Sequence, residues 1–141
     1  MREVTLEPQV LTAPPVRMAS FVVRALVGLV FYDLVLTVAG FPRIRALVRR
    51  SSPRNKPTNS KTIERICNAV DIASCFYFKQ VRCMHRSFVV VRLLRKAGVN
   101  ADLVIGSRPI PFISHAWVEV DGRVVNDKQG YKRRLIEMDR M

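Results

Sequence analysis

The strongest constraint on the fold is a change of hydrophobic period in the second half of the chain. Between residues 60 and 96 the apolar residues recur at helical spacing, and after residue 101 they alternate as in β-strands. A break near residues 79–82 divides the helical part in two, and Asp121-Gly122 marks a tight hairpin between strands. Two helices followed by an antiparallel meander predict an α+β domain.

Capping and turn residues set the bounds of these elements. A cap residue at positions 58–60 can begin the first helix, and the second runs from Cys83 to Lys96, just before Gly98. The second helix is apolar on most sides, so we expect it at the centre of the domain. Strands are predicted at residues 102–106, 112–120 and 123–126.

An apolar stretch from Ala19 to Phe41 is long enough to suggest a membrane span. Arg24 and Asp33 interrupt it, and charged side chains at bilayer depth are costly, so we expect no transmembrane span. A helix that packs on its own domain or on a partner is the favoured interpretation. A helix lying in the membrane interface is the alternative.

The polar segment from Arg49 to Ser60 contains two prolines and several turn formers, which is typical of a linker. We therefore expect residues 1–57 to form an N-terminal helical extension and linker, and residues 58–141 to form the main domain. The N-terminus lacks the positive start and apolar run of a secretory signal peptide.

The charge balance is strongly basic, with 24 Lys and Arg against 11 Asp and Glu and a net charge of +13. This favours acidic partners, namely nucleic acid, an anionic membrane surface, or an acidic peptide or protein. A solvated basic surface is the simpler alternative. Interleaved aromatics and zinc spacing are missing from the sequence, so nucleic acid is not an expected partner.

Three cysteines occur, Cys67, Cys75 and Cys83, and no two of them form a CxxC pair. This pattern disfavours a disulfide framework and a thiolate metal site, so we expect no metal or cofactor and a reducing compartment such as the cytoplasm. Cys67 lies on the apolar face of its helix, and Cys75 lies beside an aromatic residue. Both are expected to be small core residues.

Cys83 lies at the predicted start of the central helix, between the basic residues Arg82 and Arg86. Free amide N–H groups and the helix dipole favour an anion there, and thiolate is the nucleophilic form of cysteine. A cysteine at a helix start is, taken alone, more often structural.

His115 lies in the second predicted strand, on the same face as Trp117 and Glu119. An imidazole beside a thiolate can shuttle its proton, although a hydrogen-bonded strand histidine is the simpler interpretation. His85 follows Cys83 by two residues, and positions two apart on a helix do not face each other. His85 is therefore a poor candidate for the general base.

Asp127 follows the hairpin, which brings its region back beside His115. A carboxylate there can hold the second nitrogen of the imidazole and fix its tautomer. Asn126 could do this more weakly, and a simple turn residue is the alternative. A helix-start cysteine, a strand histidine and an aspartate on the adjacent strand occur in the order of papain-like and transglutaminase-like enzymes, in which the cysteine helix packs on an antiparallel sheet.

The stretch from Ser60 to Asp127 resembles the lasso-peptide B2 leader peptidases, which are related to the microcin J25-processing protein within the transglutaminase-like superfamily. The most telling pieces are Cys83 with Arg86-Ser87, LLRKAG, LVIG, Pro111-Phe112 and the HAWVE run that starts at His115.

The resemblance implies a bacterial cysteine peptidase that removes the leader from a ribosomally made lasso-peptide precursor. Cys83, His115 and Asp127 would be nucleophile, base and orienting acid. Backbone N–H groups at the helix start would stabilise the oxyanion, Gln80 could add a side-chain donor, and Trp117 could contact the substrate. The freed amine would pass to a separate macrolactam-forming cyclase.

The resemblance also implies partners. We expect that this chain is too short to include a fused leader-recognition domain and that it acts with a separate recognition protein. The apolar stretch 19–41 is a candidate docking surface for that protein or for the cyclase. Another transglutaminase-like acyl transferase or peptidase is the first rival interpretation. A non-catalytic basic binding module is the second.

Overall fold

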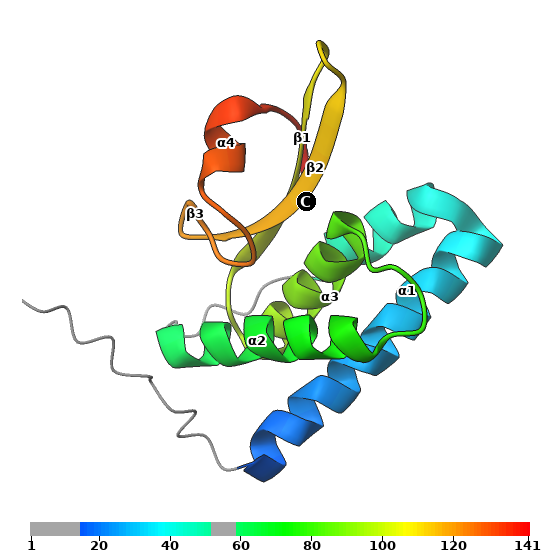
Figure 1. The fold of residues 1–141 in the computed structure, drawn as a ribbon, viewed down its shortest axis with the longest axis vertical. Helices are drawn as coiled ribbons and strands as arrows, with labels where there is room; N and C mark the ends of the chain where they lie inside the picture. Colours follow the sequence, from blue (N-terminus) through cyan, green and yellow to red (C-terminus); the bar gives the residue numbers. More distant parts are fainter. Residues whose placement is uncertain (1–14, 52–58) are drawn as a thin grey trace, which may run out of the picture.

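The structure is a computed structural model that describes residues 15–51 and 59–141 (Figure 1). In chain order the elements are α1 (Pro15–Arg50), α2 (Ser60–Phe76), α3 (Cys83–Lys96), β1 (Ala101–Arg108), β2 (Ile113–Val120), β3 (Arg123–Val124), α4 (Gly130–Arg134) and β4 (Ile136–Arg140). The strands form one antiparallel sheet in the order β3-β2-β1-β4. The predicted α+β class is therefore confirmed. Most of the predicted linker, residues 52–58, lies outside the described residues.

Helix α3 is the central helix, as its apolar sequence predicts. It packs against β1 and β2 and also against α1 and α2 (Figure 1). Phe88, Val91 and Leu94 are fully buried in the main core. The helix ends where Gly98 adopts a positive φ of 89° and the Val99 N–H bonds back to the Leu94 carbonyl, which closes the last turn.

Helix α1 continues past the predicted apolar stretch to Arg50 and bends at Gly40, where φ is 72° and the helical geometry is interrupted, two residues before Pro42. One face of the helix enters the core through Ala25 and Leu29 and packs on α2 and α3. By length and composition this helix could also cross a membrane.

The outward face of α1 is apolar as well. Its large exposed side chains include Val23, Val27, Val30 and Leu34. The helix thus packs on its own domain, as the favoured interpretation predicts, and leaves a second apolar face uncovered.

The predicted Asp121-Gly122 hairpin joins β2 to β3. Both residues have positive φ, 51° and 75°, which is the geometry of a type I′ turn. Strand β3 is shorter than predicted because the side-chain oxygen of Asn126 accepts a hydrogen bond from the Val118 N–H at 2.8 Å. A side chain thus replaces the backbone partner that a longer strand would supply.

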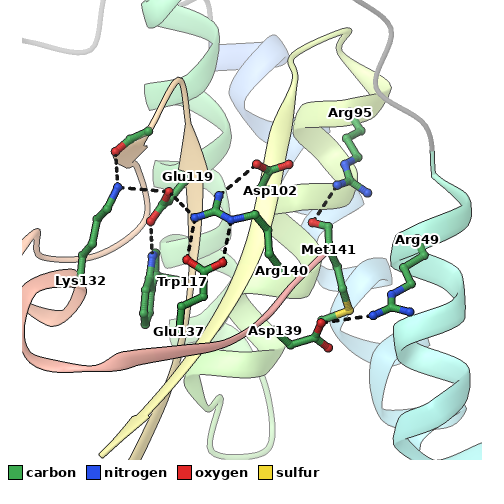
Figure 2. Close-up of polar contacts among 11 residues, drawn as sticks. Arg49, Arg95, Asp102, Trp117, Glu119, Lys132, Glu137, Asp139, Arg140 and Met141 are labelled. Atoms are coloured by element: carbon green, nitrogen blue, oxygen red, sulfur yellow. Dashed lines mark hydrogen bonds and ion pairs between the residues drawn. The ribbon is translucent and has the colours of Figure 1, made fainter.

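The C-terminal segment, α4 and β4, has no counterpart among the predicted elements. Strand β4 pairs with the free edge of β1, and Figure 2 shows the polar network that ties this segment to the sheet. Glu119 is buried at its centre, accepting from Trp117 Nε1 at 2.9 Å and pairing with Arg140 and Lys132 at 3.1 and 3.3 Å. Burial alone would raise the pKa of Glu119, but hydrogen bonds from these three donors hold it below its ordinary value.

A small second core lies on the same outer face of the sheet, where Val104, Trp117 and Val124 pack with Leu135. Gly106 is required beneath the indole, because a Cβ there would lie 2.6 Å from a ring carbon of Trp117.

Candidate active site

Cys83 is the first residue of α3, and its side chain is partly buried. The preceding residue, Arg82, is extended (φ −92°, ψ 168°) and serves as the N-cap. Cys83 is therefore in the first turn of α3, where helix-start N–H groups have no intrahelical partner, as the sequence predicts.

His115 lies near the start of β2, and its Nε2 is 2.6 Å from a carboxylate oxygen of Asp127. A ring N–H donates in this contact, so the imidazole is held with its Nδ1 free to accept or give a proton. Both side chains are mostly shielded from solvent. The hairpin therefore brings His115 and Asp127 together, while Asn126 makes its contacts elsewhere.

Cys83 and His115 border the same cavity, which has a volume of about 520 Å³. Strand β3 pairs with β2 only at Glu119 and Val120, so this pairing does not extend along β2 as far as His115. No hydrogen bond joins the Cys83 thiol to the His115 imidazole in the structure, and the imidazole stacks with Tyr131 and Trp117. Catalytic hydrogen bonds are often loose before substrate binds.

A buried serine sets the spacing between α3 and β2. Ser87, one turn after Cys83, donates to the Ala116 carbonyl at 3.0 Å and accepts from the Asn126 side-chain amide at 3.0 Å. Because Ala116 follows His115 and Asn126 precedes Asp127, this one hydroxyl links the three segments that carry the candidate catalytic residues.

Comparison with known proteins agrees with this arrangement. A family model described as the transglutaminase-like superfamily matches residues 28–138, which is most of the chain. The chain belongs to the transglutaminase-like superfamily. The match begins inside α1, whose buried face shares the main core with α3 and the sheet. A division into two parts at residue 57 stays a prediction.

One curated relative refines this assignment. The chain is 43% identical over 53 residues to the microcin J25-processing protein McjB of Escherichia coli. This alignment covers 38% of this chain and 26% of the relative, so the chain spans about a quarter of the length of the protein that it matches. The predicted resemblance to the microcin J25-processing family is confirmed over that region. No solved structure gives a significant match.

Cys67 and Cys75, the other two cysteines, differ in burial. Cys67 is buried, as predicted, and burial raises the pKa of its thiol to about 12, which keeps it protonated. The prediction for Cys75 is wrong, because its side chain is exposed at the end of α2. Its neighbour Phe76 is also exposed, so none of the residues that the structure describes buries this end of the helix.

Gln80 and Trp117, the two residues predicted to assist the catalytic residues, differ in their exposure. Gln80 is exposed and borders the Cys83 cavity, in the segment before α3. The predicted contact between Trp117 and substrate is not supported, because the indole is only 2% exposed and packs beneath Leu135. Its N–H is occupied by Glu119. Trp117 therefore supports β2 from behind.

Sequence reasoning missed an aromatic contact to the imidazole. The ring of Tyr131, in α4, stacks on His115 with centroids 4.1 Å apart and planes inclined by 25°. The ring shields one face of the His115–Asp127 pair from solvent. The short polar sequence around Tyr131 gave no periodic signal that could have placed it there.

Proposed function

We propose that this protein is a cysteine peptidase that removes the leader from a lasso-peptide precursor, acting with a separate leader-recognition protein. The observation that carries the proposal is the convergence of Cys83 and His115 on one cavity, with His115 bonded to Asp127. The partial identity to the microcin J25-processing protein supports the choice of substrate.

The chemistry follows from these positions. The Cys83 thiolate attacks the carbonyl carbon at the junction of leader and core, and the N–H groups at the start of α3 stabilise the oxyanion. His115 gives a proton to the departing amine as the C–N bond breaks, which releases the core and leaves a thioester. His115 then takes a proton from water, whose attack releases the leader carboxylate and restores the thiolate. Asp127 holds the imidazole throughout.

The surroundings of the site support the expected setting. Cys67, Cys75 and Cys83 are all free thiols, which fits a reaction in the reducing cytoplasm. Among the residues that the structure describes, no three His, Cys, Asp or Glu side chains gather as metal ligands.

The recognition protein is proposed to dock on the outward side of α1. A groove of about 520 Å³ between α1 and α3 has an apolar floor, including Val27 and Phe88, and three cations at its rim, Arg24, Arg92 and Lys96. The described residues that line the groove include no acidic side chain, so the groove suits an apolar segment flanked by carboxylates. Reversing Arg92 to Glu should weaken binding of the recognition protein in a pull-down without unfolding this protein.

The decisive experiment combines this protein, the recognition protein and the precursor, with mass spectrometry of the products. Free leader and free core should appear, and Cys83→Ala should abolish both. Cys75→Ala is the matched control, because it removes an exposed thiol outside the cavity and should change nothing. An intact precursor after incubation with folded wild-type protein would overturn the proposal. Leader joined to an added amine would favour acyl transfer instead.

A further inference from the structure

Asp33 is an acidic residue in the middle of the apolar helix α1, and the proposed chemistry gives it no role. Its side chain turns inward, is only 16% exposed, and borders the same cavity as Cys83. An acidic side chain on a buried helix face needs a reason, since an unpaired charge there is costly.

The Asp33 carboxylate is fully engaged. One oxygen lies 3.0 Å from His85 Nε2, and the other accepts a hydrogen bond from the Tyr77 hydroxyl at 2.5 Å. Lys79 adds its ammonium at 3.7 Å. Burial alone would raise the pKa of Asp33, but the bonds from Tyr77 and His85 hold it below its ordinary value, so the group is a carboxylate at neutral pH.

His85 also contacts Arg82, the residue before Cys83. Its Nδ1 accepts a hydrogen bond from the Arg82 backbone N–H at 3.4 Å. Because Nδ1 accepts, the ring proton is on Nε2 and points at Asp33, which fixes the tautomer. The ring of Tyr32 packs on the imidazole at 4.5 Å between centroids. Asp33 is thus linked through one imidazole to the N-cap of α3.

The second set of contacts reaches the other end of the same segment. Tyr77 is the C-cap residue directly after α2, and Lys79 lies in the connection between α2 and α3 that also contains Gln80. Asp33 therefore bonds to residues at the beginning of this connection and, through His85, to its end. A single carboxylate from α1 attaches both ends of the segment that leads into Cys83.

We propose that Asp33 is a positioning residue, which through His85 and Tyr77 holds the 77–82 segment and the first turn of α3 so that Cys83 faces the scissile carbonyl. The inference rests on the proposed role of Cys83 as nucleophile. It gives α1 a part in the active site, and a misplacement of about 1 Å at a reacting group can lower a rate roughly 100-fold.

The first test compares Asp33→Ala with Asp33→Asn. An asparagine oxygen can accept from His85 Nε2 while its amide donates to the Tyr77 oxygen, so Asp33→Asn should keep kcat within about threefold. Asp33→Ala breaks both links and should lower kcat by about 10- to 100-fold with KM little changed. Wild-type kcat in folded Asp33→Ala would overturn the inference, as would equal losses in both variants.

A double-mutant cycle tests whether Asp33 acts through His85. His85→Ala should lower kcat as Asp33→Ala does, and the double variant should lose little more, because both changes break one chain of contacts. Additive losses would overturn the linkage. Asp71→Asn is the matched control. Asp71, on α2, forms an ion pair with Arg86 of α3, the helix that carries His85, but Asp71 does not border the cavity. The substitution should leave kcat unchanged.

A third measurement separates this inference from the proposed function. In a Cys75→Ala background, iodoacetamide reports on Cys83 without any precursor. Asp33→Ala should slow this alkylation at least about threefold, since the thiol is no longer held against the N–H groups at the helix start, and Asp33→Asn should not. If the wild type fails to cleave the precursor, the proposed function fails while the alkylation rates still decide the role of Asp33. Equal rates would refute that role.

Discussion

The side-chain amide of Asn126 donates to the hydroxyl of Ser87 at 3.0 Å, and this hydrogen bond joins α3 to the end of the β2–β3 hairpin. Ser87 is completely buried, and its own proton is directed at the Ala116 carbonyl. Ser87 is one helical turn from Cys83, Ala116 is adjacent to His115, and Asn126 is adjacent to Asp127. The register between helix and sheet therefore depends on a hydroxyl that takes no part in the chemistry.

Ser87→Ala should reduce both stability and activity. It leaves the Asn126 amide with an unpaired N–H in a shielded site, which costs about 1–3 kcal/mol, and it frees α3 to shift against β2. Denaturant unfolding and kcat on the precursor measure the two effects. Ser74→Ala is the control, because the Ser74 hydroxyl bonds only within its own helix, to the Val70 carbonyl. Equal behaviour of the two variants would contradict the prediction.

Asp127→Ala should lower kcat by about 100-fold, because general acid–base catalysis typically contributes 10²–10⁴ and depends on the orientation of the imidazole. KM should change little. Asp121→Asn is the control in the same hairpin, since Asp121 is exposed and asparagine tolerates its positive φ. Steady-state kinetics of the two variants decide the matter, and an active, folded Asp127→Ala protein would remove Asp127 from the proposed triad.

The stacking of Tyr131 on His115 predicts a difference between two substitutions. Tyr131→Phe keeps the ring and should retain wild-type kcat. Tyr131→Ala opens the face of the His115–Asp127 pair to water and should lower kcat about tenfold, because a hydrogen bond weakens in a wetter site. The melting temperature should fall only slightly, since Tyr131 is more than a third exposed. Equal kcat in both variants would show that the ring has no such role.

Local sequence signals predicted the parts of the fold that local physics determines. The helix from Cys83 to Lys96 and the Asp121-Gly122 turn follow from periodicity, capping and positive φ, and all are confirmed. They also bring His115 beside Asp127, as predicted. The catalytic roles of these residues stay a prediction.

The features that the sequence did not reveal depend on contacts between distant residues. Strand β4 pairs with β1, about thirty residues earlier, and its apolar–polar alternation is only a few residues long, with Ile136 and Met138 both exposed. In the sequence Asp33 indicates only a charge that disfavours membrane insertion, and the fold shows that its carboxylate contacts His85. Exposure of Cys75 likewise depends on what covers the end of α2, which local periodicity does not report.

Glu119 should make stability depend on pH in the acid range. The pKa of Glu119 is lowered in the folded protein. The ionised Glu119 therefore contributes fully to the free energy of unfolding above the ordinary carboxyl pKa of about 4.3, and this contribution is lost as pH falls through the lowered pKa of the folded state. Glu119→Gln should cost about 1–3 kcal/mol at pH 7, because Arg140 and Lys132 lose a charged acceptor. As pH falls through the lowered folded-state pKa of Glu119, the unfolding free energies of the wild type and the variant should converge.

Denaturant unfolding at a series of pH values measures that convergence. Glu64→Gln is the matched control, since Glu64 is exposed on α2, and its unfolding free energy should follow the wild type at every pH. A constant gap between wild type and Glu119→Gln from pH 7 to pH 3 would mean that Glu119 acts by packing alone. If the difference in unfolding free energy between the two proteins closes as pH falls, the ionised Glu119 carboxylate is what holds α4 and β4 on the sheet. The same carboxylate would then also help to keep Tyr131 over His115.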